Sequence, residues 1–256
     1  MVLLLQNSSQ LALKHIFVKE CRAMNRIFWA GDSTVQTNDY TTYPQNGIGQ
    51  AFSIFIRKEY SVCNHARNGR STKSFLDEGR LEAIKEQIGE GDFLFIQFGH
   101  NDEKIQDPTR YTEPHSSFID NLGIFIQTAR DKGAYPVLIT PLERRCFVDE
   151  KHLGPGEHLE YVEGMKEAAA KFQVPLVDLY AMSRRELEKV GEERSRGWYM
   201  YFSEGYYPEH PEESRDNTHL RYDGAVHFSG LIAEGLRELG GVYAGMLLDE
   251  KGIYGE

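Results

Sequence analysis

The most constraining feature of this sequence is a series of five short apolar segments separated by helical patterns. The segments cover residues 26–30, 60–66, 92–98, 135–140 and 176–179. In 92–98 and 135–140 the apolar residues are continuous rather than alternating, which is typical of parallel strands covered on both faces. Alternation of such strands with helices predicts an α/β fold in which helices cover both faces of a parallel sheet.

Apolar residues recur at helical spacing in four stretches. The first contains Leu81, Ile84 and Ile88, and the others cover residues 118–129, 162–172 and 228–239. The second ends at Lys132-Gly133, a basic last turn followed by a glycine cap. The stretch 191–215, rich in Glu, Tyr and Pro, shows neither pattern, and we expect it to be a long loop.

Composition excludes several classes of protein. The 256 residues carry a formal net charge of -10 and no dense basic cluster, so we expect no nucleic-acid partner. The apolar runs are far too short to span a bilayer, so we expect no membrane partner. Three well-separated cysteines argue against a disulfide framework and against a structural zinc site. The sequence makes no prediction of oligomeric state.

The N-terminal residues 1–23 precede Met24 and the first predicted strand, and they are interpreted either as a mis-assigned start or as a loose extension outside the domain. They lack the basic-then-apolar order of a signal peptide, so a cytoplasmic location is expected. Residues 24–256 are expected to form a single α/β domain with a substantial core.

Three polar motifs follow successive predicted strands, at the sheet edge where functional loops gather. Ser33 lies in the expected first strand-to-helix turn, where backbone N–H groups converge. Gly69 follows Asn68 in a predicted turn, and Asn101 carries an amide that can donate to an oxyanion. Each motif alone also fits a structural role as a helix cap or a plain turn.

A fourth motif, Asp216-Asn217-Thr218-His219, precedes the last predicted helix. A serine nucleophile needs a base, and histidine titrates in the right range. A carboxylate on its other ring nitrogen fixes the tautomer, and a turn brings residues three apart into contact. Four such motifs in this order predict a serine hydrolase with a nucleophile, oxyanion donors and an oriented base.

At these residues the sequence resembles the SGNH (GDSL-type) hydrolase family, named for a serine, a glycine, an asparagine and a histidine in separate blocks. Ser33, Gly69, Asn101 and His219 occupy those blocks, and the resemblance covers residues 26–239. It is greatest to the rhamnogalacturonan acetylesterase branch, on segments 31–35, 69–75, 95–102 and 140–145. Thr34 stands where many lipolytic members carry leucine.

The resemblance implies a flavodoxin-like three-layer α/β/α sandwich with a five-stranded parallel sheet. It implies Ser33, Asp216 and His219 as catalytic residues, and an oxyanion hole formed by the N–H groups of Ser33 and Gly69 and the Asn101 side chain. It further implies metal-free hydrolysis without a cofactor, through an acyl-enzyme. The implied substrate is an acetylated, pectin-derived oligosaccharide.

Candidate substrate contacts can also be inferred from the residues. Arg144 and Arg145 follow the fourth predicted strand, where paired N–H donors would meet uronate carboxylates. The alternative for both is an exposed ion pair. Tyr201 lies in an aromatic stretch that fits either a platform for sugars or the packing of a loop.

Three rival functions remain open at the level of sequence. Histidines and acids near His219 invite a metal site, although no HExxH pattern is present. A lipase or thioesterase on the same fold would need an apolar acyl groove. A carbohydrate-binding protein with an inactive esterase fold is the third, and the filled catalytic positions count against it.

Overall fold

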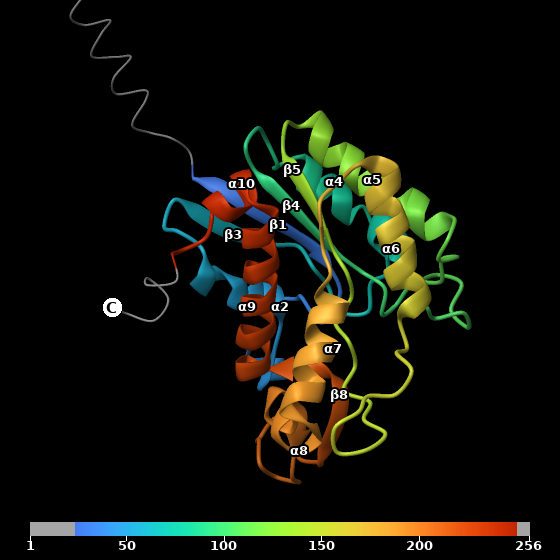
Figure 1. Cartoon of the computed structure of the whole chain (residues 1–256), viewed down its shortest axis with the longest axis vertical. Helices are drawn as coiled ribbons and strands as arrows, with labels where there is room; N and C mark the ends of the chain where they lie inside the picture. Colours follow the sequence, from blue (N-terminus) through green and yellow to red (C-terminus); the bar gives the residue numbers. More distant parts are fainter. Residues whose placement is uncertain (1–23, 250–256) are drawn as a thin grey trace, which may run out of the picture.

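A five-stranded parallel sheet forms the centre of the protein, for which a computed structural model describes residues 24–249 (Figure 1). Its strands are β1 (Asn25–Gly31), β3 (Tyr60–Asn64), β4 (Phe93–Gln97), β5 (Tyr135–Ile139) and β6 (Leu176–Val177). They lie in the order β3-β1-β4-β5-β6, and every neighbouring pair is parallel. This is the flavodoxin-like order, so the predicted fold class is confirmed.

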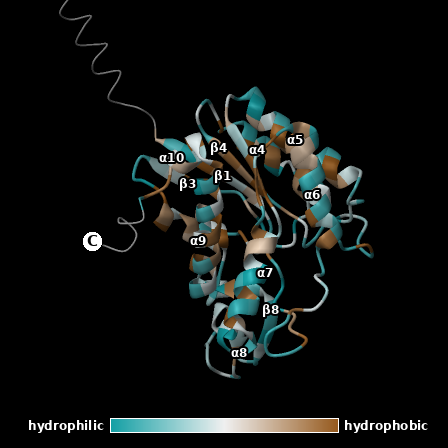
Figure 2. Ribbon diagram, in the orientation of Figure 1, coloured by the Kyte–Doolittle hydropathy of each residue, from teal (hydrophilic) through white to brown (hydrophobic). Residues whose placement is uncertain are grey.

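Alternate residues of each central strand enter opposite cores, because successive side chains of a strand point to opposite faces. In β1, Ile27 and Trp29 pack into one core, whereas Phe28 and Ala30 pack into the other. All four are fully buried, which explains the continuous apolar runs in the sequence. Figure 2 shows hydrophobic residues concentrated on these strands.

Helices cover both faces of the sheet and complete the three layers. The face of Ile27 and Trp29 is covered by α2 (Ile48–Ala51), α7 (Leu179–Val190) and α9 (Tyr222–Leu239). The other face is covered by α3 (Thr72–Asp77), α4 (Arg80–Lys85), α5 (Ser117–Asp131) and α6 (Leu159–Phe172). Three short helical elements are also present, namely η1 (Tyr40–Thr42), η2 (Phe52–Phe55) and α10 (Gly241–Gly245).

The predicted helices are found, with different ends in one case. The helix α5 ends at its C-cap Lys132, and Gly133 follows with φ of 70°, as the glycine cap requires. The helix α4 is shorter than predicted, and Ile88 lies beyond its end while staying buried. Strand β6 stops at two residues because Asp178 caps α7.

A second, antiparallel sheet was not predicted. It consists of β2 (Gln45–Asn46), β8 (Ser214–Arg221) and β7 (Tyr199–Phe202), with β8 in the middle. The expectation of a long loop over 191–215 was therefore wrong. That stretch contains α8 (Glu192–Ser195), η3 (Arg196–Trp198), β7 and the first residues of β8. Tyr199 and Met200 anchor it because their side chains are buried.

The expected extension over residues 1–23 lies outside the described residues. Among the helices that the structure describes, none combines the length and apolar character that crossing a bilayer requires.

Candidate active site

Ser33 lies in a tight turn directly after β1. The backbone N–H groups of Val35 and Gln36 donate to the Asp32 carbonyl at 3.2 and 3.0 Å. The Asp32 side chain, fully buried, accepts from the N–H and the hydroxyl of Thr34 at 2.9 and 2.8 Å. No helix follows this turn before η1, which corrects the expected strand-to-helix turn. The Asp-x-Thr pattern is the signal that sequence reasoning did not use.

Asp32 is a fully buried carboxyl group directly before Ser33 in the chain. Burial acts to raise its pKa, but the nearby His100 imidazole and the bonds from Thr34 outweigh this effect and lower the pKa. Nδ1 of His100 lies 3.5 Å from Oδ2 of Asp32. A carboxylate is a stronger acceptor than a carboxylic acid, so the charge helps to hold the Ser33 turn.

Ser33, His219 and Asp216 meet in a hydrogen-bonded chain. Nε2 of His219 lies 2.9 Å from Oγ of Ser33, although the two residues are 186 positions apart. Nδ1 of His219 lies 2.6 Å from Oδ2 of Asp216. Burial acts to raise the pKa of Asp216, but the His219 partner and two backbone N–H groups outweigh it and lower the pKa. An ionised Asp216 holds the proton on Nδ1 and leaves Nε2 as the acceptor.

A wide bulge in β8 carries both Asp216 and His219. Between the pairs Tyr199–Leu220 and Tyr201–Arg215, β7 advances by two residues while β8 advances by five. The surplus residues of β8 bend away from the ladder, as bulges do next to active sites. Oδ1 of Asp216 closes the bulge by accepting from the N–H groups of Thr218 at 2.7 Å and His219 at 3.0 Å. The expected turn therefore lies within a strand.

The two other predicted oxyanion donors follow β3 and β4. The ladder beside β1 continues past β3, since Arg67 N–H donates to the Gly31 carbonyl at 3.0 Å, and this brings the Gly69 turn next to the Ser33 turn. Gly69 has φ of 77°, a left-handed conformation that favours glycine. Asn101, nearly buried, donates from Nδ2 to the Arg70 carbonyl at 3.2 Å, which leaves its second amide hydrogen for a ligand.

Arg110 was missed by sequence reasoning, because no local pattern marks it. Its Nη1 donates to Oδ1 of Asn101 at 3.2 Å. Its Nε donates to Asp107 at 2.7 Å, which holds the guanidinium in place. Arg110 therefore fixes the orientation of the Asn101 amide, with the nitrogen facing away from the guanidinium.

The geometry agrees with a comparison against known proteins. The family model of the GDSL-like lipase/acylhydrolases matches residues 27–230. This chain belongs to that family. Rhamnogalacturonan acetylesterase RhgT of Bacillus subtilis is 43% identical over 84% of this chain and 90% of its own length. A second Bacillus subtilis protein, named probable rhamnogalacturonan acetylesterase YesY, is 40% identical over 84% of this chain and 94% of its own length.

A solved structure supports the same assignment. The crystal structure of YxiM from Bacillus subtilis matches with a TM-score of 0.71 at 27% identity, over 84% of this chain. The chain covers 57% of that structure, little more than half. The predicted resemblance to GDSL-type hydrolases is confirmed, and the protein is a hydrolase of ester bonds.

Within this GDSL-type hydrolase, Arg145 and Tyr201 both hold Asn217, which lies between Asp216 and His219. The Arg145 N–H donates to the Asn217 carbonyl at 2.9 Å, and the Tyr201 hydroxyl donates to Oδ1 of Asn217. The Arg145 guanidinium lies 4.8 Å from the centre of the Tyr201 ring. These contacts brace the bulge that carries the acid–base pair.

The burial of Arg145 does not fit the expected substrate contact. Its side chain is 2% exposed, and its guanidinium donates to the Ser195 hydroxyl at 2.9 Å and to the Glu192 carbonyl. Its position after β5 could be predicted from the sequence, but its burial could not. We therefore regard Arg145 as a positioning residue.

Arg144 is also engaged within the protein. Its two terminal nitrogens pair with Glu103 at 3.1 Å and Glu157 at 2.8 Å, and the side chain is 20% exposed. This arrangement matches the ion-pair alternative, although the pairs are more enclosed than the sequence suggested.

Asp102 lies buried beside the Asn101 turn and joins it to the start of α3. Its Oδ1 accepts from Thr72 N–H at 3.0 Å, from the Thr72 hydroxyl at 2.6 Å and from the Thr112 hydroxyl at 3.0 Å. Burial outweighs these bonds and raises the pKa of Asp102 to about 7. The Gly69 and Asn101 turns are thus tied together through one buried carboxyl group.

Proposed function

We propose that this hydrolase removes O-acetyl groups from rhamnogalacturonan oligosaccharides, with Ser33 as the nucleophile. The observation that carries the chemistry is the chain from Ser33 through His219 to Asp216, with distances of 2.9 and 2.6 Å. The substrate class is supported by the names of two relatives that align over most of this chain.

Acylation begins when Oγ of Ser33 attacks the ester carbonyl and passes its proton to Nε2 of His219. The developing oxyanion accepts hydrogen bonds from the N–H groups of Ser33 and Gly69 and from the free amide hydrogen of Asn101. The bond to the sugar oxygen then breaks, and the imidazolium of His219 protonates that leaving oxygen.

Deacylation repeats these steps with water as the nucleophile. His219 takes a proton from the water as it attacks the acetyl-serine, and then returns a proton to Oγ of Ser33 as acetate leaves. Asp216 stays ionised throughout and stabilises the imidazolium in both halves.

The test is acetate release from acetylated rhamnogalacturonan oligosaccharides, with acetylated xylan as the comparison substrate. Wild type is compared with Ser33→Ala and with Ser53→Ala, a matched change at an exposed serine outside the site. We expect release from the first substrate, retained in Ser53→Ala and abolished in Ser33→Ala.

Other outcomes would redirect the proposal. Serine-dependent release from xylan alone would keep the chemistry and change the sugar. If the enzyme hydrolyses aryl esters with longer acyl chains faster than aryl acetates, the result would favour a lipase or thioesterase. Absence of serine-dependent release from any ester would contradict the assignment of Ser33. A cytoplasmic location stays a prediction of the sequence.

A further inference from the structure

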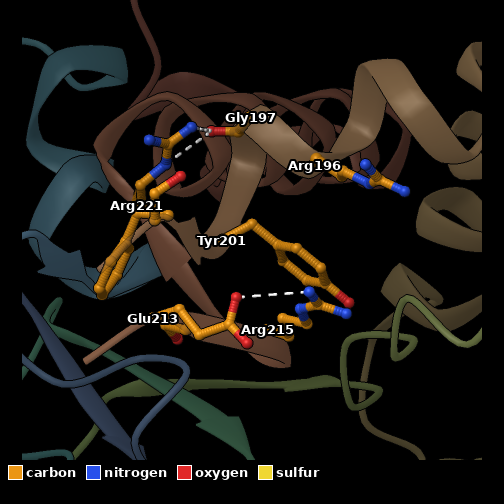
Figure 3. A pocket seen from close by; sticks show the side chains of 9 residues that line it. Arg196, Gly197, Tyr201, Glu213, Arg215 and Arg221 are labelled. Carbon is orange, nitrogen blue, oxygen red and sulfur yellow. Dashed lines mark hydrogen bonds and ion pairs between the residues drawn. The ribbon is translucent and has the colours of Figure 1, made fainter. Parts of the chain in front are cut away.

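The second sheet borders a cavity that the mechanism does not use. It has a volume of about 400 Å³, within the range of small-molecule sites. Its walls come from η3, β7 and β8 (Figure 3). The lining of the cavity includes Arg196, Tyr201, Glu213, Arg215 and Arg221.

The cavity carries an excess of positive charge. Three arginines and one glutamate line it, in a chain whose formal net charge is -10. Arg221 is half-buried, and its Nε and Nη2 donate to the Gly197 carbonyl at 3.1 and 2.8 Å. Within residues 24–249, this guanidinium pairs with no carboxylate. A partly desolvated cation held in this way is preorganised to receive an anion.

Arg215 is the second available cation. It pairs with Glu213 at 3.3 Å, and both side chains are largely exposed. Exposed pairs of this kind contribute little energy, so an incoming carboxylate can replace Glu213. Arg196 is less available, since it pairs with both Glu192 and Glu193 outside the cavity wall.

The cavity shares a wall with the catalytic bulge. Arg215 immediately precedes Asp216 in β8. Tyr201 lines the cavity, and its hydroxyl donates to Asn217 within the bulge. A ligand group in the cavity therefore lies against the strand that carries Asp216 and His219.

We infer that this cavity binds the carboxylate of a uronate residue in the oligosaccharide whose acetyl ester is cleaved at Ser33. The inference rests on the proposed function and assigns the acidic sugar a site. It replaces the sequence-based expectation for Arg144 and Arg145, whose guanidinium groups are already engaged. Arg221 and Arg215 offer charged N–H donors to the carboxylate oxygens, and Tyr201 offers an aromatic wall to the sugar ring.

The experiment measures binding rather than hydrolysis. Wild type is titrated calorimetrically with deacetylated rhamnogalacturonan oligosaccharides and with the same oligosaccharides after chemical reduction of their carboxylates to alcohols. The variants are Arg221→Gln, Arg215→Gln and, as a matched control, Arg185→Gln, an exposed arginine of α7 outside the cavity.

We expect the acidic oligosaccharide to bind about 10- to 100-fold more tightly than the reduced one, because charged hydrogen bonds are lost on reduction. Arg221→Gln and Arg215→Gln should each remove most of this difference, whereas Arg185→Gln should keep it. Arg215 is exposed, so its variant tests the site even if Arg221→Gln fails to fold.

Equal binding of the acidic and reduced oligosaccharides would overturn the inference. The inference would also be overturned if Arg185→Gln removed as much of the affinity difference as Arg221→Gln and Arg215→Gln do, because this would indicate a general charge effect. Neither outcome bears on acetate release, so the proposed function stands or fails separately. Conversely, arginine-dependent binding without acetate release would leave the uronate site in place and contradict the proposed function.

Discussion

The two sheets of this protein hold the two halves of the catalytic chain in different ways. The parallel sheet supplies the Ser33 turn, and residues Ile27 to Ala30 of β1 are fully buried between two helical layers. The antiparallel sheet supplies Asp216 and His219, and most of β8 is only half-buried. Ser33 is therefore fixed by the core, and His219 by specific polar contacts around a bulge.

This difference predicts different effects for substitutions near Ser33 and substitutions near His219. A change near Ser33 disturbs closely packed and buried side chains, so we expect it to lower the free energy of unfolding of the domain. A change near His219 acts through a few hydrogen bonds to Asn217, and it can alter catalysis without unfolding the protein.

The largest expected effect comes from breaking the link between the two sheets. Ser33→Ala and His219→Ala should each lower kcat by about 10⁶-fold, and the double variant should lose little more, because the two residues act as a unit. The measurement is kcat on an aryl acetate, with circular dichroism as the control for folding. Independent, multiplying losses would contradict a shared proton-transfer step.

The next effect tests the oxyanion donor on the parallel sheet. Asn101→Ala should lower kcat by about 10²–10³-fold with little change in KM, since the amide bonds the oxyanion more strongly than the ground-state ester. The measurement is steady-state kinetics on the same aryl acetate. A change confined to KM would make Asn101 a binding residue instead.

A third prediction concerns stability on the same side of the molecule. Burial raises the pKa of Asp102 to about 7, so the folded protein holds a proton that the unfolded chain releases above about pH 4. Asp102 therefore makes the free energy of unfolding fall as pH rises from about 4 to 7, and the loss levels off above that range.

Asp102→Asn should remove this contribution, which is on the order of 2–3 kcal/mol between pH 5 and 8. The measurement is urea unfolding of wild type and variant at both pH values. The free energy of unfolding of the variant minus that of wild type should be larger at pH 8 than at pH 5. A difference that does not change with pH would mean that Asp102 is ionised throughout this range.

The smallest expected effect tests the bracing of the bulge. Tyr201→Phe removes the hydroxyl that bonds Asn217 and should lower kcat on a small aryl acetate by about tenfold, the value of one net hydrogen bond. Tyr40→Phe is the matched control, because Tyr40 is exposed on η1. An unchanged kcat in Tyr201→Phe would show that the Tyr201 hydroxyl does not position the bulge.

The two sheets also differ in how much the sequence could predict. The parallel sheet was predictable because strands buried on both faces must be continuously apolar, as in Phe93-Leu94-Phe95-Ile96. The strand β8 was not predictable from an apolar pattern, since Leu220 is its single apolar residue. Its extended form comes from pairing with β7 and β2, which no local pattern records.

The same limit applies to the site. Ser33, Asp216 and His219 could be proposed from residue type and from their places beside predicted strands and helices, because the chemistry constrains the residue types. The roles of Arg145 and Arg110 depend on which side chains surround them after folding. A guanidinium near a strand end has the same sequence signature whether it meets a sugar or, like Arg145, the interior.

The order of the parts along the chain has a consequence for synthesis. The nucleophile leaves the ribosome early, and all five strands of the parallel sheet are made before residue 178. The base comes from β8, near the end, and β2 must wait for β8 as its pairing partner. Because chains fold from the N-terminus as they emerge, the nascent protein carries Ser33 without its base for most of its synthesis. We therefore expect hydrolytic activity to begin only when β8 docks, and we expect a chain that ends before β8 to be inactive.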